Sequence, residues 1–390
     1  MSTIKVQNIQ HTASSTNAIS LASDGTCTAN ITNNLSNKNI IINGGMIVSQ
    51  RNGTTATAVT SANQYTLDRI KGSNNSDAAF TIAQSSTAPD GFANSLKVDV
   101  TTADTSLGAA HYGQIIYRVE AQDLQQLAFG TSGAKASILS FYVRSNKTGN
   151  YGVAVLQDDN SSKQVTFQYT INSADTWERK SFVIPADTSG VINNDNGAGF
   201  DIHIGFAAGT TYTSGSLRSS FTAFANGDFY AGQGVNLFDS TSNEWYITGI
   251  QLEVDNTGSG KPTDFEHRLF NQELALCQRY YYDHLGGFPE DDTAYGVGSV
   301  YNAGYTFCYI PFRVQMRAKP TLETNDNANS HGLRVGATDH GFNKNFLSAA
   351  GTSSATIYPN VGTISVTAGQ CGILLTKSTT NCKLRFSAEL

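Results

Sequence analysis

The sequence predicts an all-β protein whose main body is a β-sandwich of the jelly-roll type. Charged residues make up only 14% of the 390 residues, against about 25% in an average soluble domain, so neutral polar side chains must hydrate most of the surface. Short apolar runs of strand length recur along the chain with turn residues between them. A helical period is confined to one segment. The length is sufficient for two or three domains.

Residues 1–38 are expected to form a short N-terminal β segment. Apolar residues alternate with polar ones in pieces such as Ile4–Val6 and Ile19–Leu21, and a period of two is typical of a strand with one buried face. The segment contains too few large apolar residues to form a core of its own. It must therefore pack on the rest of the chain, on another protein or on further copies of itself, and copies of itself are the preferred interpretation.

Residues 39–262 are expected to form the sandwich. In the last apolar run of this region, Ile250, Leu252 and Val254 point one way while Gln251 and Glu253 point the other, as in a strand. About ten such runs with turn residues between them indicate two packed sheets. The expected strands are 39–42, 79–82, 96–98, 114–119, 138–143, 152–156, 164–169, 180–184, 200–204 and 245–254.

Residues 263–285 are expected to form a connecting amphipathic helix. Apolar residues recur with a period close to 3.6 between Phe265 and Tyr282. Asp264 is placed to cap the helix, and Pro262 fits just before its start. Residues 286–390 return to strand signals and are expected to form a small C-terminal β domain. Its expected strands are 305–310, 363–366, 372–375 and 383–386, with a polar, loop-rich stretch from Asn325 to Asn345.

Charge and hydropathy exclude two classes of partner. The net charge is −6 and the longest cluster of cations is Arg179-Lys180, so the chain is not expected to bind nucleic acid. No apolar run approaches the roughly 18 residues of a membrane span, so no membrane insertion is expected. The first ten residues lack a basic stretch followed by an apolar one. We therefore expect a protein made in a cytoplasm without a secretory signal.

The cysteines are expected to be reduced. They are Cys27, Cys277, Cys308, Cys371 and Cys382. Their odd number and irregular spacing fit neither a disulfide framework nor a zinc site, so small buried thiols are the favoured interpretation. The spacing alone leaves open whether Cys308 pairs with Cys371 or Cys382.

No catalytic, metal or cofactor site is expected from the motifs. The run Asp255–Lys261 lacks the first glycine of a phosphate loop and the Ser or Thr after its lysine. Gly130–Gly133 lacks the second spacer of a nucleophile elbow. On a helix, His267, Cys277 and His284 would lie about 10–15 Å apart, which is too far for one metal ion. The Asp/Asn loops at 158–160 and 193–196 offer oxygen ligands for Ca²⁺ but lack the EF-hand pattern, so plain turns are favoured.

Two sets of residues bear on glycan chemistry. Asp99, Asp201, Glu244 and Glu253 lie in or beside strands, but nothing distinguishes them from ordinary polar-face residues, so the chain is not expected to be an enzyme. Aromatic faces suit the C–H patches of sugars, and Trp177, Tyr212 and Trp245 lie near expected sandwich loops. For each of the three aromatic residues, packing in the core or on a sheet is the favoured role, so the glycan-contacting residues remain unknown.

Three stretches of the chain resemble tail-fibre-like proteins of marine phages that infect cyanobacteria. The similarity is good over residues 1–50 and 245–283, and looser between them. It is carried by the opening Met1–Gly25, by Asn39-Ile-Ile-Ile-Asn-Gly-Gly-Met46 with Leu67-Asp-Arg69, and by Gly249-Ile-Gln-Leu-Glu253, Phe265-Glu-His-Arg268 and Glu273-Leu-Ala-Leu-Cys-Gln-Arg-Tyr-Tyr281.

The resemblance implies a structural virion protein, a homotrimer in a phage tail appendage. Residues 1–38 would attach it to other tail or particle proteins, the jelly roll would resemble carbohydrate-binding modules, and residues 286–390 would face the host. The host partner would be a cell-surface glycan or protein. Two alternatives remain: a glycan depolymerase on the same scaffold, and a purely structural particle protein without receptor contact.

Overall fold

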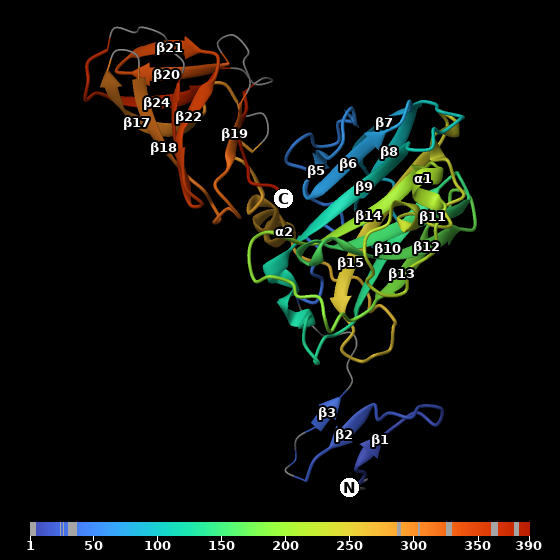
Figure 1. Cartoon of the computed structure of the whole chain (residues 1–390). Coiled ribbons are helices and arrows are strands. Elements are labelled where there is room, and N and C mark those ends of the chain that lie inside the picture. The colour runs from blue at the N-terminus through green and yellow to red at the C-terminus, as the bar shows by residue number, and fades with distance from the viewer. Residues whose placement is uncertain are drawn as a thin grey trace.

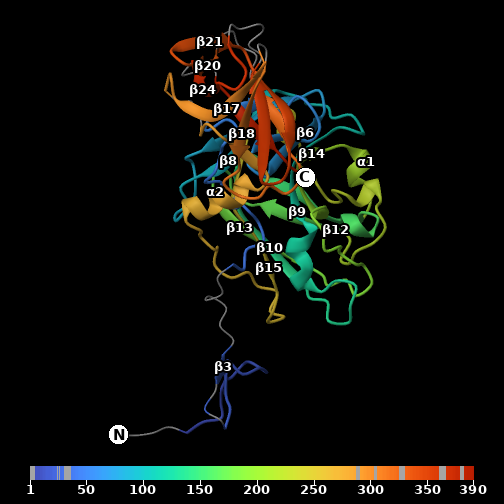
Figure 2. The same cartoon turned by 90° about the vertical axis from the view of Figure 1, so that its left-hand side faces the viewer.

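The computed structural model describes residues 5–23, 25, 27–29, 37–286, 290–302, 305–324, 330–359, 366–377 and 382–390. This part of the chain is built mainly of antiparallel sheets (Figure 1). A small N-terminal sheet and a C-terminal unit lie at opposite ends of a central sandwich, as Figure 2 also shows. The all-β fold class predicted from the sequence is thereby confirmed.

The central sandwich consists of two six-stranded sheets. The first sheet has the order β13-β10-β15-β8-β7-β4 and the second the order β12-β11-β14-β9-β6-β5. The first contains β4 (Thr57–Ala58), β7 (Ala79–Ser85), β8 (Ser95–Thr102), β10 (Ser137–Ser145), β13 (Glu178–Ile184) and β15 (Glu244–Val254). The second contains β5 (Gln64–Leu67), β6 (Ile70–Asn75), β9 (Tyr112–Glu120), β11 (Gly149–Gln157), β12 (Lys163–Ile171) and β14 (Ala198–Ala208). Short helical turns lie between them: η1 (Ala121–Leu127), η2 (Asp158–Asn160), α1 (Thr210–Thr213), η3 (Asn226–Asp228) and η4 (Leu237–Asp239).

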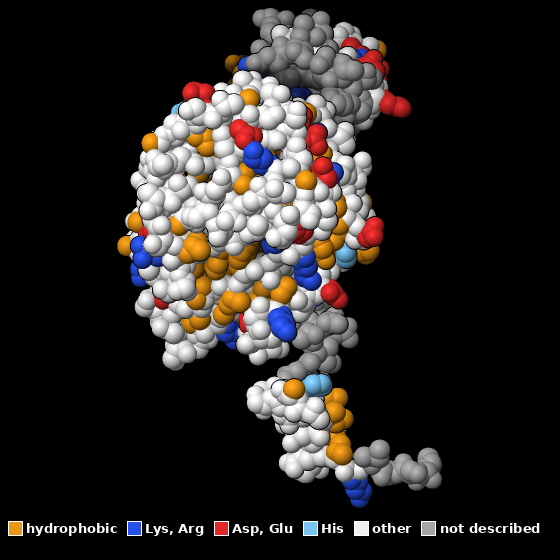
Figure 3. Space-filling view, turned by 90° about the vertical axis from the view of Figure 1, so that its right-hand side faces the viewer, with side chains coloured by type: hydrophobic (Ala, Val, Ile, Leu, Met, Phe, Trp, Pro, Cys, Tyr) orange, Lys and Arg blue, Asp and Glu red, His pale blue; other side chains and the backbone are white. Residues whose placement is uncertain are grey.

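The core of the sandwich lies between the inner faces of the two sheets. Trp245 of β15 is fully buried there. Its ring packs on that of Phe206 at 4.9 Å, and its indole N–H donates to the hydroxyl of Tyr169 at 3.3 Å. Outside the core, neutral polar side chains and backbone form most of the sandwich surface in the view of Figure 3. This agrees with the low charge content of the sequence.

The expected strand at 39–42 does not form. The segment runs beside β15, where Ile40 N donates to Leu252 O at 2.8 Å. The Asn39 side chain takes the place of a regular ladder, because its amide donates to Ile250 O at 3.1 Å and its Oδ1 accepts from Leu252 N at 3.1 Å. Asn43 then adopts a left-handed conformation with φ of 62°, which ends the extended run.

The connecting helix is shorter than predicted. Helix α2 covers Phe270–Gln278, and Leu269, not Asp264, precedes it without a side-chain cap. The residues before it run extended along the sandwich, where Glu266 N donates to the Gln251 side chain at 2.8 Å. The tyrosines after it form strand β16 (Tyr281–Asp283). Tertiary hydrogen bonds on both sides therefore override the helical period.

The C-terminal unit contains a seven-stranded sheet of order β21-β20-β24-β17-β18-β23-β22 and a three-stranded sheet of order β16-β25-β19. Its strands are β17 (Ala294–Asn302), β18 (Tyr305–Pro311), β19 (Thr321–Thr324), β20 (His331–Val335), β21 (Thr338–Phe342), β22 (Asn345–Ala350), β23 (Ser354–Pro359), β24 (Cys371–Thr376) and β25 (Leu384–Ser387). Apolar side chains from both sheets share one core.

In the C-terminal region, one expectation from the sequence is wrong and another lies mostly outside the described residues. The stretch from Asn325 to Asn345 was expected to be loop-rich, but its described part forms the hairpin β20–β21 and the start of β22. Gly336, with φ of 61°, supplies the turn of that hairpin, so glycines that indicated a loop instead serve a strand pair. The expected strand at 363–366 lies, apart from Val366, outside the described residues.

Buried polar contacts join the C-terminal unit to the sandwich. The guanidinium of Arg69 lies 3.5 Å from the centre of the Tyr280 ring and 2.7 Å from the Glu389 carboxylate. Arg317 donates to the carbonyls of Asn196 and Glu389 at 2.7 and 2.9 Å. Arg69 is fully buried, so its loss would leave Glu389 with Arg51, at 3.4 Å, as its remaining ion-pair partner.

The N-terminal sheet is small and leaves its apolar side chains exposed. It pairs β1 (Asn8–Ile9), β2 (Ile19–Leu21) and β3 (Cys27–Ala29) in that order. Val6, Ile9 and Leu21 are among the exposed large hydrophobic residues. The composition of residues 1–38 predicts this outcome, because the segment offers no core to cover them.

The described cysteine side chains are free thiols. Cys277, Cys308 and Cys382 are buried and Cys371 is exposed. The pairing left open for Cys308 is therefore absent from the described part of the chain. The Cys382 sulfur instead lies 3.1 Å from His331 Nδ1. Among the helices that the structure describes, none has both the length and the hydropathy needed to cross a membrane.

Candidate functional site

The outer face of the second sheet combines polar groups with an aromatic pocket. Along β14, Phe200, Ile202 and Ile204 point into the core, so the alternation of a strand turns Asp201 and His203 outward. Asp201 lies in register with Arg118 of β9 and with Leu156 of β11. Side chains from three neighbouring strands therefore meet on one face.

The aromatic pocket has a volume of about 290 Å³. It is closed on one side by α1, η3 and the residues that follow η3. Tyr112 and Tyr212 meet edge to face at 5.4 Å, and Phe224 and Phe229 lie 5.7 Å apart, measured between ring centres. Phe224 is exposed, so its ring is open to solvent. The pocket is lined by Tyr112, Gln114, Leu156, His203, Tyr212, Phe224, Asn226, Phe229 and Tyr230.

His203 presents an unpaired acceptor at this pocket. Its Nδ1 lies 3.2 Å from Gln114 Oε1, which also accepts from the hydroxyl of Tyr230. Since a carbonyl oxygen only accepts, Nδ1 carries the proton and Nε2 is the acceptor. Burial, together with the positive charges of Arg118 and Lys71, lowers the pKa of His203 to about 3, so the ring is neutral near pH 7. Nε2 is buried and has no hydrogen-bond partner among the described residues.

A polar cluster adjoins the pocket through His203. We use this name for Lys71, Arg118, Asp158, Asp201 and His203. Arg118 Nε donates to Asp201 Oδ2 at 2.8 Å, and His203 Nε2 lies 4.0 Å from the same oxygen. Asp158, at the end of β11, hydrogen bonds the Asp201 carboxyl. Burial and then the Asp201 charge raise the pKa of Asp158 to about 7, whereas burial and the Arg118 charge lower the pKa of Lys71 to about 8.

The pocket offers ring faces and a neutral acceptor, and the carboxyl pair lies beside it in the polar cluster. Two carboxyl groups that share a hydrogen bond lie closer together than the roughly 5–9.5 Å that glycoside hydrolysis requires. Asp201 Oδ1 is buried and meets no donor in the described part of the chain while Asp158 is ionised. The chemistry that fits is therefore the binding of hydroxyl donors next to an apolar patch.

The structure separates the three aromatic residues singled out in the sequence. Tyr212 lines the aromatic pocket. Trp245 is in the sandwich core, the packing role favoured for it. Trp177 packs on Tyr246 at 6.2 Å, on the outer side of the first sheet. His203 and Gln114 were not singled out, although the alternation in Phe200-Asp-Ile-His-Ile204 already places two polar side chains outside a central strand.

The four carboxylates singled out in the sequence do not form one group. Asp201 belongs to the polar cluster. Asp99 and Glu244 lie in register on the first sheet and both contact Lys97 Nζ, at 3.4 and 2.6 Å. Although partial burial opposes it, the hydrogen bond from Lys97 lowers the pKa of Glu244, the opposite of what a catalytic acid needs. Glu253 is buried and accepts from Thr263 N at 2.8 Å.

The Asp/Asn loops bind each other. Asn193 donates from its backbone and side-chain nitrogens to the Asp159 carboxylate, at 2.9 and 2.7 Å. These contacts use the oxygens that a Ca²⁺ ion would need. Asp158, from the same loop, belongs instead to the polar cluster.

The His and Cys residues near the expected helix also lie in separate places. The His267 ring packs on Phe92 at 5.0 Å, Cys277 is buried in another cluster, and His284 Nε2 lies 2.8 Å from Tyr295 O.

One further grouping within the described ranges brings together potential metal ligands: Asp77, Asp104 and His111, with ligand atoms within 4.8 Å of one another. His111 Nδ1 lies 3.1 Å from both Asp104 Oδ2 and Gly108 N. These contacts close the loop before β9.

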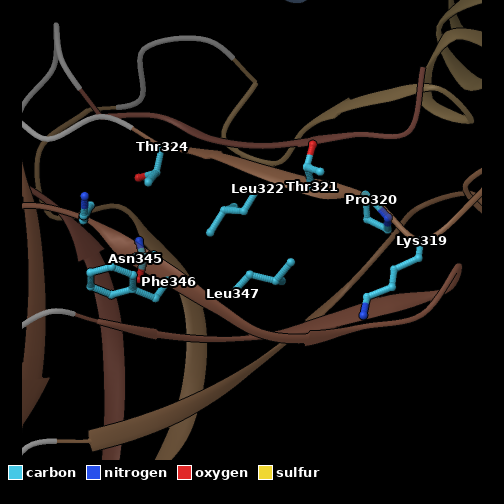
Figure 4. A pocket seen from close by; sticks show the side chains of 9 residues that line it. Lys319, Pro320, Thr321, Leu322, Thr324, Asn345, Phe346 and Leu347 are labelled. Carbon is cyan, nitrogen blue, oxygen red and sulfur yellow. The ribbon is translucent and has the colours of Figure 1, made fainter. Parts of the chain in front are cut away.

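A second hollow lies in the C-terminal unit (Figure 4). It has a volume of about 510 Å³ and lies between β19 and β22, each at the edge of its own sheet. Leu322 and Leu347 project into the gap, and Lys319 lies at one end. It is a seam between two sheets whose middle is apolar. It is lined by Lys319, Pro320, Thr321, Leu322, Thr324, Lys344, Asn345, Phe346 and Leu347.

Comparison with known proteins gives weak structural likenesses. No protein-family model matches the chain, and no curated protein matches its sequence. A tailspike enzymatic domain of bacteriophage CBA120 aligns with a TM-score of 0.31 and 10% identity, over 56% of this chain and 21% of that one. The chain thus spans about a fifth of that tailspike protein. The family 11 carbohydrate-binding module of a Clostridium thermocellum cellulase aligns with a TM-score of 0.27 and 12% identity. The alignment covers 55% of this chain and 99% of that one.

A third likeness is to the module TmCBM61 in complex with β-1,4-galactotriose. It has a TM-score of 0.28 and 8% identity, over 56% of this chain and 99% of that one. At these values the likenesses establish neither common ancestry nor a ligand. The fold class defined by the two sheets is a β-sandwich, and the site on its second sheet must be judged by its own chemistry.

Proposed function

We propose that this chain is a glycan-binding subunit of a phage tail appendage and that the outer face of its second sheet holds the glycan. The observation that carries the proposal is the buried, unpaired Nε2 of His203 beside the aromatic pocket. A buried acceptor without a donor costs about 1–3 kcal/mol. A ligand hydroxyl placed on Nε2 would remove that cost.

A sugar matches the remaining features of the site. Its C–H faces stack on aromatic rings, and Tyr212 and Phe224 supply such rings at the mouth of the pocket. Its neighbouring hydroxyls need several polar groups close together, which Asn226, Gln114 and His203 provide. A neutral glycan fits best, because the pocket is lined by uncharged side chains and His203 is neutral near pH 7.

Binding is proposed rather than catalysis. The hydrogen-bonded pair of Asp158 and Asp201 leaves no room for the water or sugar carbon that lies between the carboxyls of a glycosidase. The alternative, a glycan depolymerase on the same scaffold, predicts release of reducing ends from a polysaccharide that the protein binds. The binding function predicts none.

The appendage role draws on the ends of the chain. Residues 1–38 have exposed apolar side chains and are proposed to attach the subunit to other tail or particle proteins. Residues 286–390 are proposed to face the host. A homotrimer would multiply weak glycan contacts, with a gain in avidity of roughly 10²–10⁴. The further alternative is a purely structural particle protein, which would bind neither glycan nor host cell.

The test is affinity electrophoresis of the full chain in gels that contain soluble polysaccharides of different linkage. The wild type should be retarded by at least one of them. Tyr212→Ala and His203→Ala should lose the retardation, whereas Trp177→Ala, on the opposite sheet, should keep it. If Trp177→Ala abolishes binding while both pocket variants keep it, the site is wrong. A wild type that binds no polysaccharide and no host cell would support the purely structural alternative.

A further inference from the structure

The C-terminal unit has an outward sheet face that is aromatic. Strand β18 alternates: Thr306, Cys308 and Ile310 are buried in the core, so Tyr305, Phe307 and Tyr309 point away from it. Strands β17 and β23 are its neighbours in the sheet, and β24 lies on the far side of β17 (Figure 1). An antiparallel sheet normally has one apolar face and one polar face, and this sheet is apolar on both.

The outward side chains form one continuous patch. Val297 lies opposite Tyr309 on one side and Ile373 on the other. We call the patch the tyrosine face; it consists of Val297, Tyr301, Tyr305, Phe307, Tyr309, Tyr358 and Ile373. The exposed fractions are 56% for Val297, 68% for Tyr301, 47% for Tyr305, 60% for Tyr309 and 37% for Ile373.

The rings of the tyrosine face hold one another in place. Tyr305 and Phe307 lie 5.6 and 6.1 Å from the ring of Tyr358, and Tyr301 lies 5.7 Å from that of Phe307. Side chains that are already packed lose little freedom when a partner covers them. The face is therefore prepared for a flat protein surface.

The face contains no charged side chain, and the four charges at its β20–β21 edge cancel, while Lys344 lies at the other edge over the ring of Phe346. Arg334 and Lys377 both contact Asp339, with Arg334 Nε at 2.5 Å and Lys377 Nζ at 2.8 Å. Arg334 also contacts Asp292 at 3.3 Å. Two cations and two anions in one cluster give no net charge, so two such faces can meet without repulsion. A glycan would find neither carboxylate nor amide among these side chains, unlike in the sandwich pocket.

The exposed area is of the size that an interface core needs. At roughly 200 Å² for each aromatic side chain, the exposed parts of the three tyrosines amount to about 350 Å². The largest apolar patch of a typical soluble monomer is of this size and is often functional. A standard interface buries about 800 Å² on each partner, with Tyr and Phe enriched in its centre and charges depleted.

We infer that the tyrosine face is the surface through which copies of this chain associate. The inference rests on the proposed oligomeric appendage and deepens it by naming the contact. The tyrosine faces of three subunits meet around a common threefold axis, and this contact holds the C-terminal units together at the end opposite the N-terminal sheet.

The experiment measures the mass of the full chain by light scattering at micromolar concentration. The wild type should have a mass of about 125 kDa, three times 41.6 kDa. The Tyr309→Glu variant should have a smaller mass than the wild type, because a buried, unpaired charge at an interface is destabilising. Val191→Glu, at an exposed apolar residue of the sandwich, is the matched control and should keep the wild-type mass. Far-ultraviolet circular dichroism checks that both variants fold.

A second measurement probes the contact directly, through a cysteine beside it. Cys371 is exposed and lies in register with Ser299, next to the tyrosine face. In a Cys27→Ser background, it should react with a bulky maleimide at least about tenfold more slowly in the assembled protein than in Tyr309→Glu. An equal rate in both would overturn the inference.

The outcomes separate this inference from the proposed function. If the wild type is oligomeric and Tyr309→Glu stays so, the tyrosine face is not the contact, although the oligomer stands. If Tyr309→Glu keeps its mass but loses host-cell binding, the face binds the receptor and the inference is wrong. Binding of polysaccharide by the sandwich pocket is measured separately. A variant that loses this binding should keep the wild-type mass in light scattering.

Discussion

Asp201 and His203 project side by side from β14, with His203 Nε2 4.0 Å from Asp201 Oδ2. A charged carboxylate normally favours a protonated imidazole beside it. Here burial and the positive charges of Arg118 and Lys71 outweigh that effect and lower the pKa of His203 to about 3. The pair therefore places a neutral acceptor at the aromatic pocket and an anionic one in the adjoining polar cluster.

The neutral state of His203 predicts how binding responds to acid. An ordinary histidine gains its proton near pH 6.5, and Nε2 would then stop accepting. Because the pKa of His203 is about 3, polysaccharide retardation in an Asp158→Asn background should stay constant from pH 7 to pH 5. A half-loss of binding near pH 6.5 would show that His203 is protonated in the free site.

The raised pKa of Asp158 predicts that its contribution to the stability of the folded state falls as the pH rises. Burial raises its pKa from 3.8 to about 7, so the folded state binds this proton more tightly than the unfolded state does. The contribution is complete below about pH 4 and is lost as pH rises through about 7. The melting temperature of Asp158→Asn minus that of the wild type should therefore increase from pH 4 to pH 7 and then level off. Asp90→Asn, which removes an exposed carboxyl group, is the matched control.

Truncation of Trp245 to alanine should cause a large loss of stability of the folded protein. It is fully buried between the sheets, and truncation of such a side chain to alanine costs about 3–5 kcal/mol through lost burial and the cavity that remains. Trp177→Ala, on the outer side of the first sheet, should cost about 1 kcal/mol. Urea unfolding measures both. A similar cost for the two variants would contradict the placement of Trp245 in the core.

Deletion of residues 1–38 should affect assembly into particles but not the folding of the sandwich. Deleting them removes a peripheral sheet with exposed apolar side chains and the hydrogen bonds of Asn37 and Lys38 to the 264–266 segment, so the thermal unfolding of the sandwich should change only slightly. Incorporation into particles, followed by immunoblotting of purified virions, should be abolished. Normal incorporation of the truncated protein would contradict the attachment role.

The sequence predicts the sandwich well because its strands have local signals. The runs from β7 to β15 alternate apolar and polar residues between turns, and each expected strand from 79–82 onward in the sandwich lies within an observed one. The failures have tertiary causes. At 39–42 the Asn39 side chain replaces a ladder, and at 265–269 contacts with β15 keep the chain extended. Neither contact leaves a period in the sequence.

The candidate site was only partly predictable. Tyr212 and Asp201 were singled out by residue type, but nothing local distinguishes Tyr212 from Trp245, which lies in the core. Asp158 was interpreted as a turn residue, because its role depends on β11 ending next to β14. The apolar run Tyr305–Ile310 does contain a signal: six consecutive residues without charge predict a strand covered on both faces.

The most direct test of the account is calorimetric titration of the full chain with the polysaccharide that retards it most. The wild type and a double variant, His203→Ala with Tyr212→Ala, should both unfold cooperatively at similar temperatures. The double variant should lose affinity by at least about a hundredfold, because this variant lacks both the unpaired acceptor and a ring face. Equal affinities for the two proteins would show that the sugar binds elsewhere.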